Sequence, residues 1–132
     1  MMKHSVTIVI PALNEEENIQ ASYNKSKSAL VELHLEHEII LVNDGSSDNT
    51  LEIMQSIDLN DPVVQVINHS ISQGIGFAYK KGVGLSKKTH FLLIPGDDDF
   101  DKTQIKKIVK QIGQKEIIIP LKSKKNILKC YK

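Results

Sequence analysis

The sequence lacks arginine and tryptophan entirely, and among its 132 residues it has a single cysteine, Cys130. All 17 basic residues are therefore lysines, which attract phosphate as mobile point charges and not through the rigid two-pronged fork of arginine. One cysteine excludes a disulfide within the chain and a cysteine-based metal site. We therefore expect a protein of a reducing compartment, the cytoplasm.

Long apolar runs are also missing. No stretch approaches the roughly 20 residues that span a bilayer, and we find no signal-peptide pattern, repeat or low-complexity linker. The formal net charge of +1 gives no reason to expect nucleic acid as a partner. With 40% hydrophobic and 25% charged residues, the composition is typical of a globular protein of one domain.

The chain does contain short, continuously apolar runs rich in β-branched residues, which are typical of strands covered on both faces. The expected strands are Val6–Ile10, Glu38–Val42, Val63–Ile67, His90–Ile94 and Glu116–Pro120. The expected helices are Glu15–Leu33 with Asn14 as N-cap, a segment from Ser47 or Asp48 through Ile57, Gly76–Leu85 and Thr103–Ile112. This alternation predicts an α/β fold with a mostly parallel sheet.

Three of the expected strands lead directly into acidic or polar turns. These turns are Pro11–Glu17, Asn43–Asp48 and Pro95–Asp99. Because an α/β sheet places its ligands beyond the carboxyl ends of its strands, the three turns predict one shared cleft.

Asp44 is the first candidate residue in that cleft. A carboxylate at the end of a buried strand can accept hydrogen bonds from the N–H edge of a nucleobase, although an Asp-Gly-Ser turn also serves as a plain turn or helix cap. Gly74 and Gly76 follow the third strand. They favour either a close approach of the backbone to a ligand at a helix start or a simple turn.

Asp97, Asp98 and Asp99 form the densest acidic cluster of the chain. Adjacent carboxylates repel one another, and a divalent cation with oxygen ligands, Mg²⁺ or Mn²⁺, would relieve this repulsion and bridge a substrate diphosphate. A solvated acidic loop is the alternative interpretation.

The C-terminal tail, residues 121–132, carries five lysines and no acidic residue. We interpret it either as a frayed, solvated terminus or as a short basic amphipathic segment that touches an anionic membrane.

In this order and at these spacings, three motifs resemble the N-terminal, nucleotide-binding part of the inverting family 2 glycosyltransferases. The motifs are Val9–Glu16, Asn43–Asp48 and Gly74–Ala78, and the resemblance covers about residues 4 to 120. It implies a GT-A fold, a Rossmann-like three-layer sandwich, truncated at its C-terminal side. Residues 1–120 would form the domain that binds the nucleotide-diphospho-sugar, and residues 121–132 the basic tail.

The resemblance also implies roles for single residues. The implied contacts to a UDP- or GDP-sugar are Pro11, Ala12, Asn14, Glu15, Asp44, Gly45, Ser46, Gly74, Gly76 and Asp97, with Asp44 on the base. The Asp-X-Asp metal motif of the family can be placed on Asp97 and Asp99, or one step earlier with Pro95 at its first position. Asp97 is a metal ligand in both alignments, and Asp99 is its expected helper.

The implied activity is inverting transfer of a sugar to a polyprenyl phosphate or a polysaccharide, in cell-envelope or polysaccharide biosynthesis, at the inner face of a membrane. The stretch Pro11–Ile19 is most similar to the polyprenyl-phosphate sugar transferases. No carboxylate that would deprotonate the acceptor is assignable, so we expect the catalytic base and the acceptor half outside this chain.

Two alternatives stay open at this point. The first is a non-catalytic module that binds a nucleotide sugar or has a regulatory role. The second is another α/β class, such as a nucleotidyltransferase or a receiver domain that uses Asp44 and Lys122, which leaves Pro11–Glu17 and Gly74–Ala78 unexplained.

Overall fold

The computed structural model describes residues 4–114, 119–122 and 128–131. Four parallel strands form its main sheet, in the order β3-β2-β1-β4. Their bounds are Ser5–Ala12 for β1, Glu36–Asp44 for β2, Val64–His69 for β3 and His90–Leu93 for β4. All four strands were expected from their apolar runs, and the parallel α/β arrangement is confirmed.

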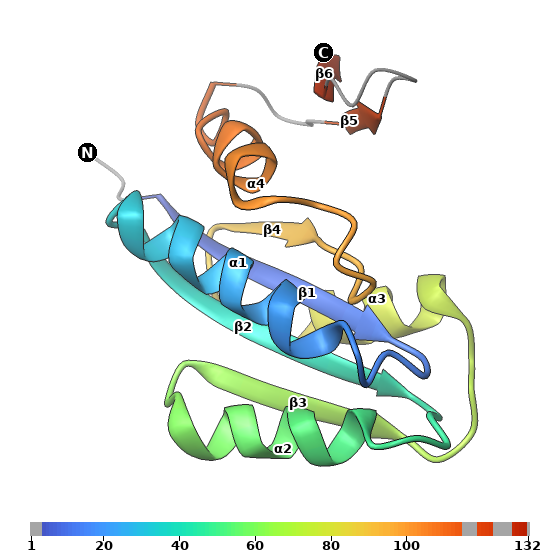
Figure 1. Ribbon diagram of the computed structural model, residues 1–132. Coiled ribbons are helices and arrows are strands. Elements are labelled where there is room, and N and C mark those ends of the chain that lie inside the picture. The colour runs from blue at the N-terminus through green and yellow to red at the C-terminus, as the bar shows by residue number, and fades with distance from the viewer. Residues whose placement is uncertain (1–3, 115–118, 123–127, 132) are drawn as a thin grey trace.

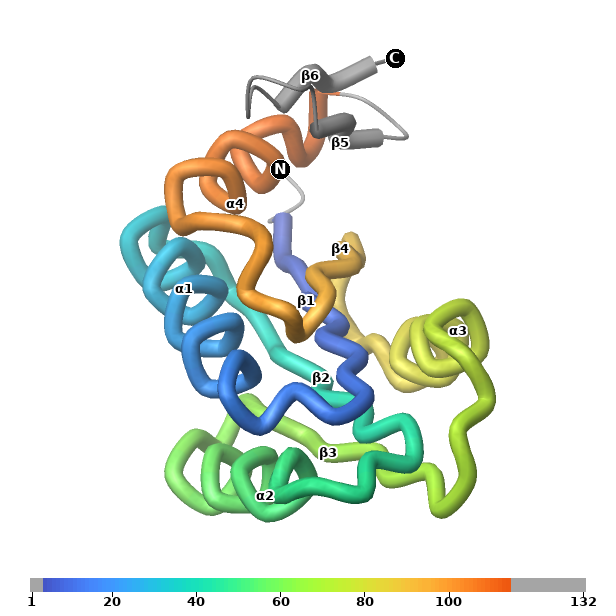
Figure 2. The backbone as a smooth tube through the Cα atoms, turned by 45° about the vertical axis from the view of Figure 1, so that its right-hand side comes forward, coloured from blue at the N-terminus to red at the C-terminus, as the bar shows by residue number. Residues whose placement is uncertain are grey.

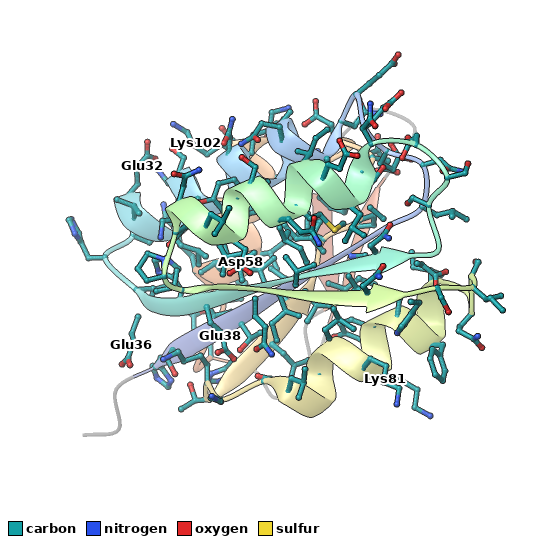
Figure 3. The ribbon with its side chains drawn as sticks, turned by 90° about the horizontal axis from the view of Figure 1, so that it is seen from below. Glu32, Glu36, Glu38, Asp58, Lys81 and Lys102 are labelled. Atoms are coloured by element: carbon teal, nitrogen blue, oxygen red, sulfur yellow. The ribbon has the colours of Figure 1, made fainter. Side chains whose placement is uncertain are left out.

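Helices cover both faces of this sheet (Figure 1). Their bounds are Ile19–Glu32 for α1, Thr50–Asn60 for α2, Ile75–Leu85 for α3 and Lys102–Val109 for α4. Seen from below, α2 and α3 lie on opposite sides of the strands (Figure 3). The predicted three-layer sandwich is therefore confirmed.

The core is split by the sheet into two apolar clusters. In β1, Ile8 and Ile10 pack with residues of α1, α2 and α4, whereas Val9 packs with Ala78 of α3. The period of two along a strand produces this alternation. All three β1 side chains are fully buried, which explains why the run Val6–Ile10 is continuously apolar.

Helix α3 lies very close to the sheet because it faces β1 with a glycine. A Cβ atom at Gly82 would lie 2.4 Å from Cγ1 of Val9. On the other face, α4 lies beside α1 (Figure 2), where Glu32 pairs with Lys102 at 2.7 Å and with Lys106 at 2.9 Å. The turn before α4 is closed by a capping box between Asp101 and Gln104.

The expected start of the first helix was wrong. Helix α1 begins at Ile19 after Asn18, and Asn14 is not its N-cap but has a left-handed backbone with φ 53°. The turn is held by the neighbouring loop, since the Asn14 carboxamide accepts from the Ser47 N–H at 2.8 Å and the Glu15 N–H donates to the Thr50 hydroxyl at 2.9 Å. These tertiary hydrogen bonds take the place of the first helical turn.

The fifth strand does not join the parallel sheet, so that prediction was wrong too. Strand β5, Ile119–Lys122, pairs antiparallel with β6, Leu128–Tyr131, in a separate two-stranded sheet. An apolar run predicts a strand but not its partner, and here the partner is the segment closest in sequence. Residues 116–118 of the expected strand, and 123–127 and 132 of the basic tail, lie outside the described residues.

Within the described residues, no helix combines the length and the apolar character needed to cross a membrane.

Candidate functional site

A pocket of about 240 Å³ lies at the carboxyl ends of the parallel strands. It is lined by Pro11, Ala12, Leu13, Glu15, Asp44, Ser72, Gly74, Ile75, Pro95, Gly96 and Asp97. The turns after β1, β2 and β4 thus meet at one cavity, as the sequence predicts. Asp44 and Asp97, which come from different turns, line the same pocket.

Five predicted site residues are not among those that line this pocket. They are Asn14, Gly45, Ser46, Gly76 and Asp99. Asp99 bonds to a lining residue, since its N–H donates to Asp97 Oδ1 at 3.1 Å. Asn14 and Ser46 bond to each other, with the Ser46 hydroxyl accepting from the Asn14 N–H at 2.9 Å, and so join the turns after β1 and β2.

Asp44 ends β2 and is only 3% exposed, because the apolar run before it carries it to the end of a buried strand. Each of its carboxylate oxygens accepts two hydrogen bonds. Oδ1 accepts from His69 Nδ1 at 3.1 Å and from the Gln73 N–H at 2.9 Å. Oδ2 accepts from the Ser72 hydroxyl at 2.9 Å and from the Gly74 N–H at 3.0 Å. A carboxylate offers about four acceptor positions, so all of them are occupied.

The charge of Asp44 is stabilised by these donors. Burial by itself would raise the pKa of this carboxyl group, but the hydrogen bonds from Gln73, His69, Ser72 and Gly74 outweigh it and lower the pKa below its ordinary value. Asp44 is therefore ionised at neutral pH. The pocket thus contains a fixed negative charge that can accept hydrogen bonds and cannot donate them.

The segment Ser70–Gly74, which we call the strap, joins β3 to α3 at the edge of the molecule (Figure 1). All of its residues are exposed. In the described part of the chain, the hydrogen bonds that fasten the strap to the sheet all end on Asp44. Gly45 lets the strap lie this close, since a Cβ atom there would be 2.5 Å from the Ser72 nitrogen.

The three aspartates after β4 do not act as one cluster. Asp97 faces the pocket, whereas Asp98 has a left-handed backbone with φ 59° and pairs with Lys25 of α1 at 2.6 Å. The Asp98 N–H donates to the Ser22 hydroxyl of the same helix at 2.9 Å. Lys25 thus neutralises the middle carboxylate, and this relieves part of the repulsion that we had assigned to a cation.

Within the described residues, no three His, Cys, Asp or Glu side chains come together as a ready-made metal site. Mg²⁺, however, is commonly held by one or two carboxylates, with water and substrate phosphate as the other ligands. Asp97 at the pocket and Asp99 bonded to it fit that kind of site.

Sequence reasoning missed Ser72 and Ile75, which line the pocket from the strap and from the start of α3. It also missed His69 at the end of β3, which donates to Asp44. The rule that pointed to the turns after β1, β2 and β4 applies equally to β3. In that segment only the glycines Gly74 and Gly76 were named, because Ser72 and His69 belong to none of the acidic turns.

A family model described as "Glycosyl transferase family 2" matches residues 7–125 of the chain. The chain is 30% identical over 124 residues to a dolichyl-phosphate beta-glucosyltransferase of Trichomonas vaginalis, covering 86% of this chain and 37% of the relative. It is 35% identical over 94 residues to an undecaprenyl-phosphate 4-deoxy-4-formamido-L-arabinose transferase of Yersinia pestis, covering 71% of this chain and 28% of the relative.

Among solved structures, the chain is similar to glucosyl-3-phosphoglycerate synthase of Mycobacterium tuberculosis, determined in complex with Mn²⁺, UDP and phosphoglyceric acid. The TM-score is 0.64 at 25% sequence identity, and the match covers 86% of this chain and 40% of that one. The chain thus spans well under half the length of each of these three proteins.

Proposed function

The chain belongs to glycosyl transferase family 2, and from this premise we propose that its pocket binds a nucleotide-sugar donor, a UDP- or GDP-sugar, for an inverting glycosyl transfer. The observation that supports the proposal best is that Asp44 and Asp97 line one pocket. Such a donor has N–H groups on its base and negative charge on its diphosphate. Asp44 can accept hydrogen bonds from the base directly, whereas Asp97 can bind the diphosphate through a cation.

We assign the base to Asp44. Its four acceptor positions are filled, so a base can bind only if one present donor leaves. The Ser72 hydroxyl is the donor that can leave at least cost, because it turns about its own bond and lies in the pocket wall. The backbone N–H groups of Gln73 and Gly74 cannot turn away without moving the strap.

We assign the diphosphate end to Asp97, assisted by Asp99. Mg²⁺ or Mn²⁺ held there would neutralise the diphosphate as it leaves with the electron pair of the broken C–O bond. The chain has no arginine that could take over this neutralisation. The structure of glucosyl-3-phosphoglycerate synthase with Mn²⁺ and UDP supports a divalent cation in this fold.

For the acceptor we propose a polyprenyl phosphate, as the names of both relatives indicate for those proteins. A phosphate monoester has its second pKa near 6, so its attacking oxygen is already anionic at neutral pH. That oxygen would attack the anomeric carbon from the side opposite to the diphosphate. A lipid acceptor of this kind would bring the reaction to a membrane surface, and the sequence-based expectation of a reducing compartment favours its cytoplasmic face.

Calorimetric titration tests the donor assignment. We expect UDP-glucose or GDP-mannose to bind about tenfold more tightly with Mn²⁺ than without it, and Asp97→Asn to remove this difference, about 1.4 kcal/mol. Asp58→Asn, an exposed position on α2, is the matched control and should retain the difference. Binding without any hydrolysis or transfer would favour the non-catalytic module, and no binding of either nucleotide sugar would exclude both functions.

The assignment of Ser72 predicts that a substitution there increases the affinity for the nucleotide. If the hydroxyl of Ser72 competes with the base for Asp44, Ser72→Ala should bind the nucleotide about three- to tenfold more tightly than the unmodified chain, since one hydrogen bond of about 1 kcal/mol no longer has to be broken. Ser70→Ala, in the same strap but with no bond to Asp44, is the control. Weaker binding by Ser72→Ala would mean that the hydroxyl assists the ligand and does not compete with it.

A further inference from the structure

One continuous stretch, about a quarter of the chain, is free of negative side chains. Residues 62–96 contain four lysines and neither aspartate nor glutamate. This stretch comprises β3, the strap, α3 and β4, and it ends at the turn that carries Asp97. All acidic residues therefore come from other parts of the molecule, and the outer surface of α3 is a cationic one.

The same stretch exposes large apolar side chains next to the pocket. Ile71 is 72% exposed, Ile75 55% and Phe77 42%, all within seven residues. Single exposed apolar residues are normal, but three so close together indicate a surface that is covered by a partner. Ile75 also lines the pocket, so this apolar group reaches the pocket rim.

Two lysines lie on α3 directly after these residues. Lys81 Nζ lies 5.2 Å from the centre of the Phe77 ring, one helical turn earlier, and Lys80 is exposed beside it. Figure 3 shows Lys81 on the side of α3 that faces away from the sheet. Neither lysine forms an ion pair within the described residues, whereas Lys88 of the same stretch pairs with Glu36. Their charge is thus available to a partner.

We propose that this surface, formed by Ile71, Ile75, Phe77, Lys80 and Lys81, docks on an anionic lipid bilayer. Apolar side chains that enter the headgroup region together with adjacent lysines that attract anionic lipids are the features by which a protein lies on a membrane without crossing it. Because the surface begins at the pocket rim, docking brings the pocket mouth to the lipid headgroups. The inference rests on the proposed function in one respect: docking would serve the transfer reaction by bringing the pocket to the lipid phosphate that we propose as the acceptor.

The surface differs from the basic tail, the segment that the sequence singled out for membrane contact. The tail has more lysines, whereas α3 combines its lysines with apolar side chains that are exposed next to the pocket, an arrangement found at no other site among the side chains that the structure describes. The two sites are separable by mutation, since Lys124 and Lys125 can be changed without touching α3.

Co-sedimentation with lipid vesicles tests the proposal. We expect the chain to bind vesicles that contain phosphatidylglycerol, and to bind pure phosphatidylcholine vesicles at least tenfold more weakly. Lys80→Gln combined with Lys81→Gln should reduce binding to the anionic vesicles by about 25-fold, about fivefold for each lysine. Ile71→Ser should reduce it further.

The controls locate the effect. Leu59→Ser removes an apolar side chain of α2 that is 88% exposed, and Lys124→Gln with Lys125→Gln removes two charges of the tail, so both variants should bind like the unmodified chain. Equal binding by the α3 variants, loss of binding only in the tail variant, or no binding to anionic vesicles would each overturn the proposal. So would concentration-dependent dimerisation abolished by Ile71→Ser, since the surface would then pair with a second copy.

The outcome is independent of nucleotide binding. Titration of the Lys80→Gln, Lys81→Gln variant with a nucleotide sugar, without vesicles, should give the affinity of the unmodified chain. If vesicles bind and no nucleotide sugar does, the donor assignment fails while membrane docking stands. If the nucleotide sugar binds and vesicles do not, the reverse holds.

Discussion

Replacing Asp44 with alanine is expected to weaken nucleotide binding strongly and to release the strap. The variant loses the carboxylate that we assign to the base, and a hydrogen bond to a charged acceptor contributes about 1.5–3 kcal/mol, so affinity should fall by at least about tenfold. It also leaves the Gln73 and Gly74 N–H groups without their acceptor. Hydrogen exchange at these two amides should therefore become much faster. Calorimetry and amide exchange measure the two effects on one sample.

The comparison with Asp58→Ala separates a specific from a general effect. Asp58 is exposed on α2, remote from the strap (Figure 3), and its removal should change neither the affinity nor the exchange of Gln73 and Gly74. Faster exchange in Asp44→Ala with unchanged affinity would show that Asp44 only holds the strap. The base would then be bound by other residues.

The second large effect is expected for Gly45→Ala. Gly45 has φ 77°, and a Cβ atom there would lie 2.5 Å from the Ser72 nitrogen and 2.9 Å from the Ile71 carbonyl carbon. The backbone conformation costs about 1–2 kcal/mol for an L-residue, and the contact is with backbone atoms that cannot turn aside. We expect a total loss of about 3 kcal/mol or more in the free energy of unfolding, measured by urea denaturation.

Gly84→Ala is the matched control for this variant. Gly84 lies in α3 with nothing within 4 Å of a Cβ atom, so alanine there should stabilise the helix by about 0.5–1 kcal/mol. If the strap instead moved away from the new Cβ atom at little cost, the free energy of unfolding of Gly45→Ala would fall only by about 1–2 kcal/mol, the cost of the backbone conformation. The strap would then be less ordered, and the nucleotide affinity of the variant would fall as well.

Much of the fold could be predicted because it depends on local pattern. The four parallel strands are short apolar runs, and each is bounded by polar turns, so the runs themselves locate the strands within a few residues. The start of α1 could not be predicted in this way. Asn14 and the three glutamates after it have the composition of a helix start, but the bonds that hold the turn come from Ser47 and Thr50, more than thirty residues later.

The candidate site could likewise be predicted where it depends on local pattern, and could not where it depends on contacts between distant residues. That Asp44 and Asp97 line one pocket follows from the strand-end rule, since Asp44 ends β2 and Asp97 lies in the turn after β4. That Asp44 is already bonded to four donors could not be predicted, because the strap is separated from it by all of α2 and β3. The pairing of Asp98 with Lys25 spans 73 residues and is equally invisible to local pattern. This pair holds the Asp98 carboxylate against α1, whereas Asp97 lines the pocket.

The walls of the pocket are not all held in place equally firmly, because the strap forms one of them. Three of its walls are joined to one another: the turn after β1 to the turn after β2 through Asn14 and Ser46, and the turn after β4 to β1 through the Gly96 N–H and the Pro11 carbonyl. The fourth wall is the strap, and in the described part of the chain the hydrogen bonds that hold it to the sheet all end on the Asp44 carboxylate. A wider base, such as a purine in place of a pyrimidine, could therefore be admitted by swinging that wall outward, while the strands beneath keep their register.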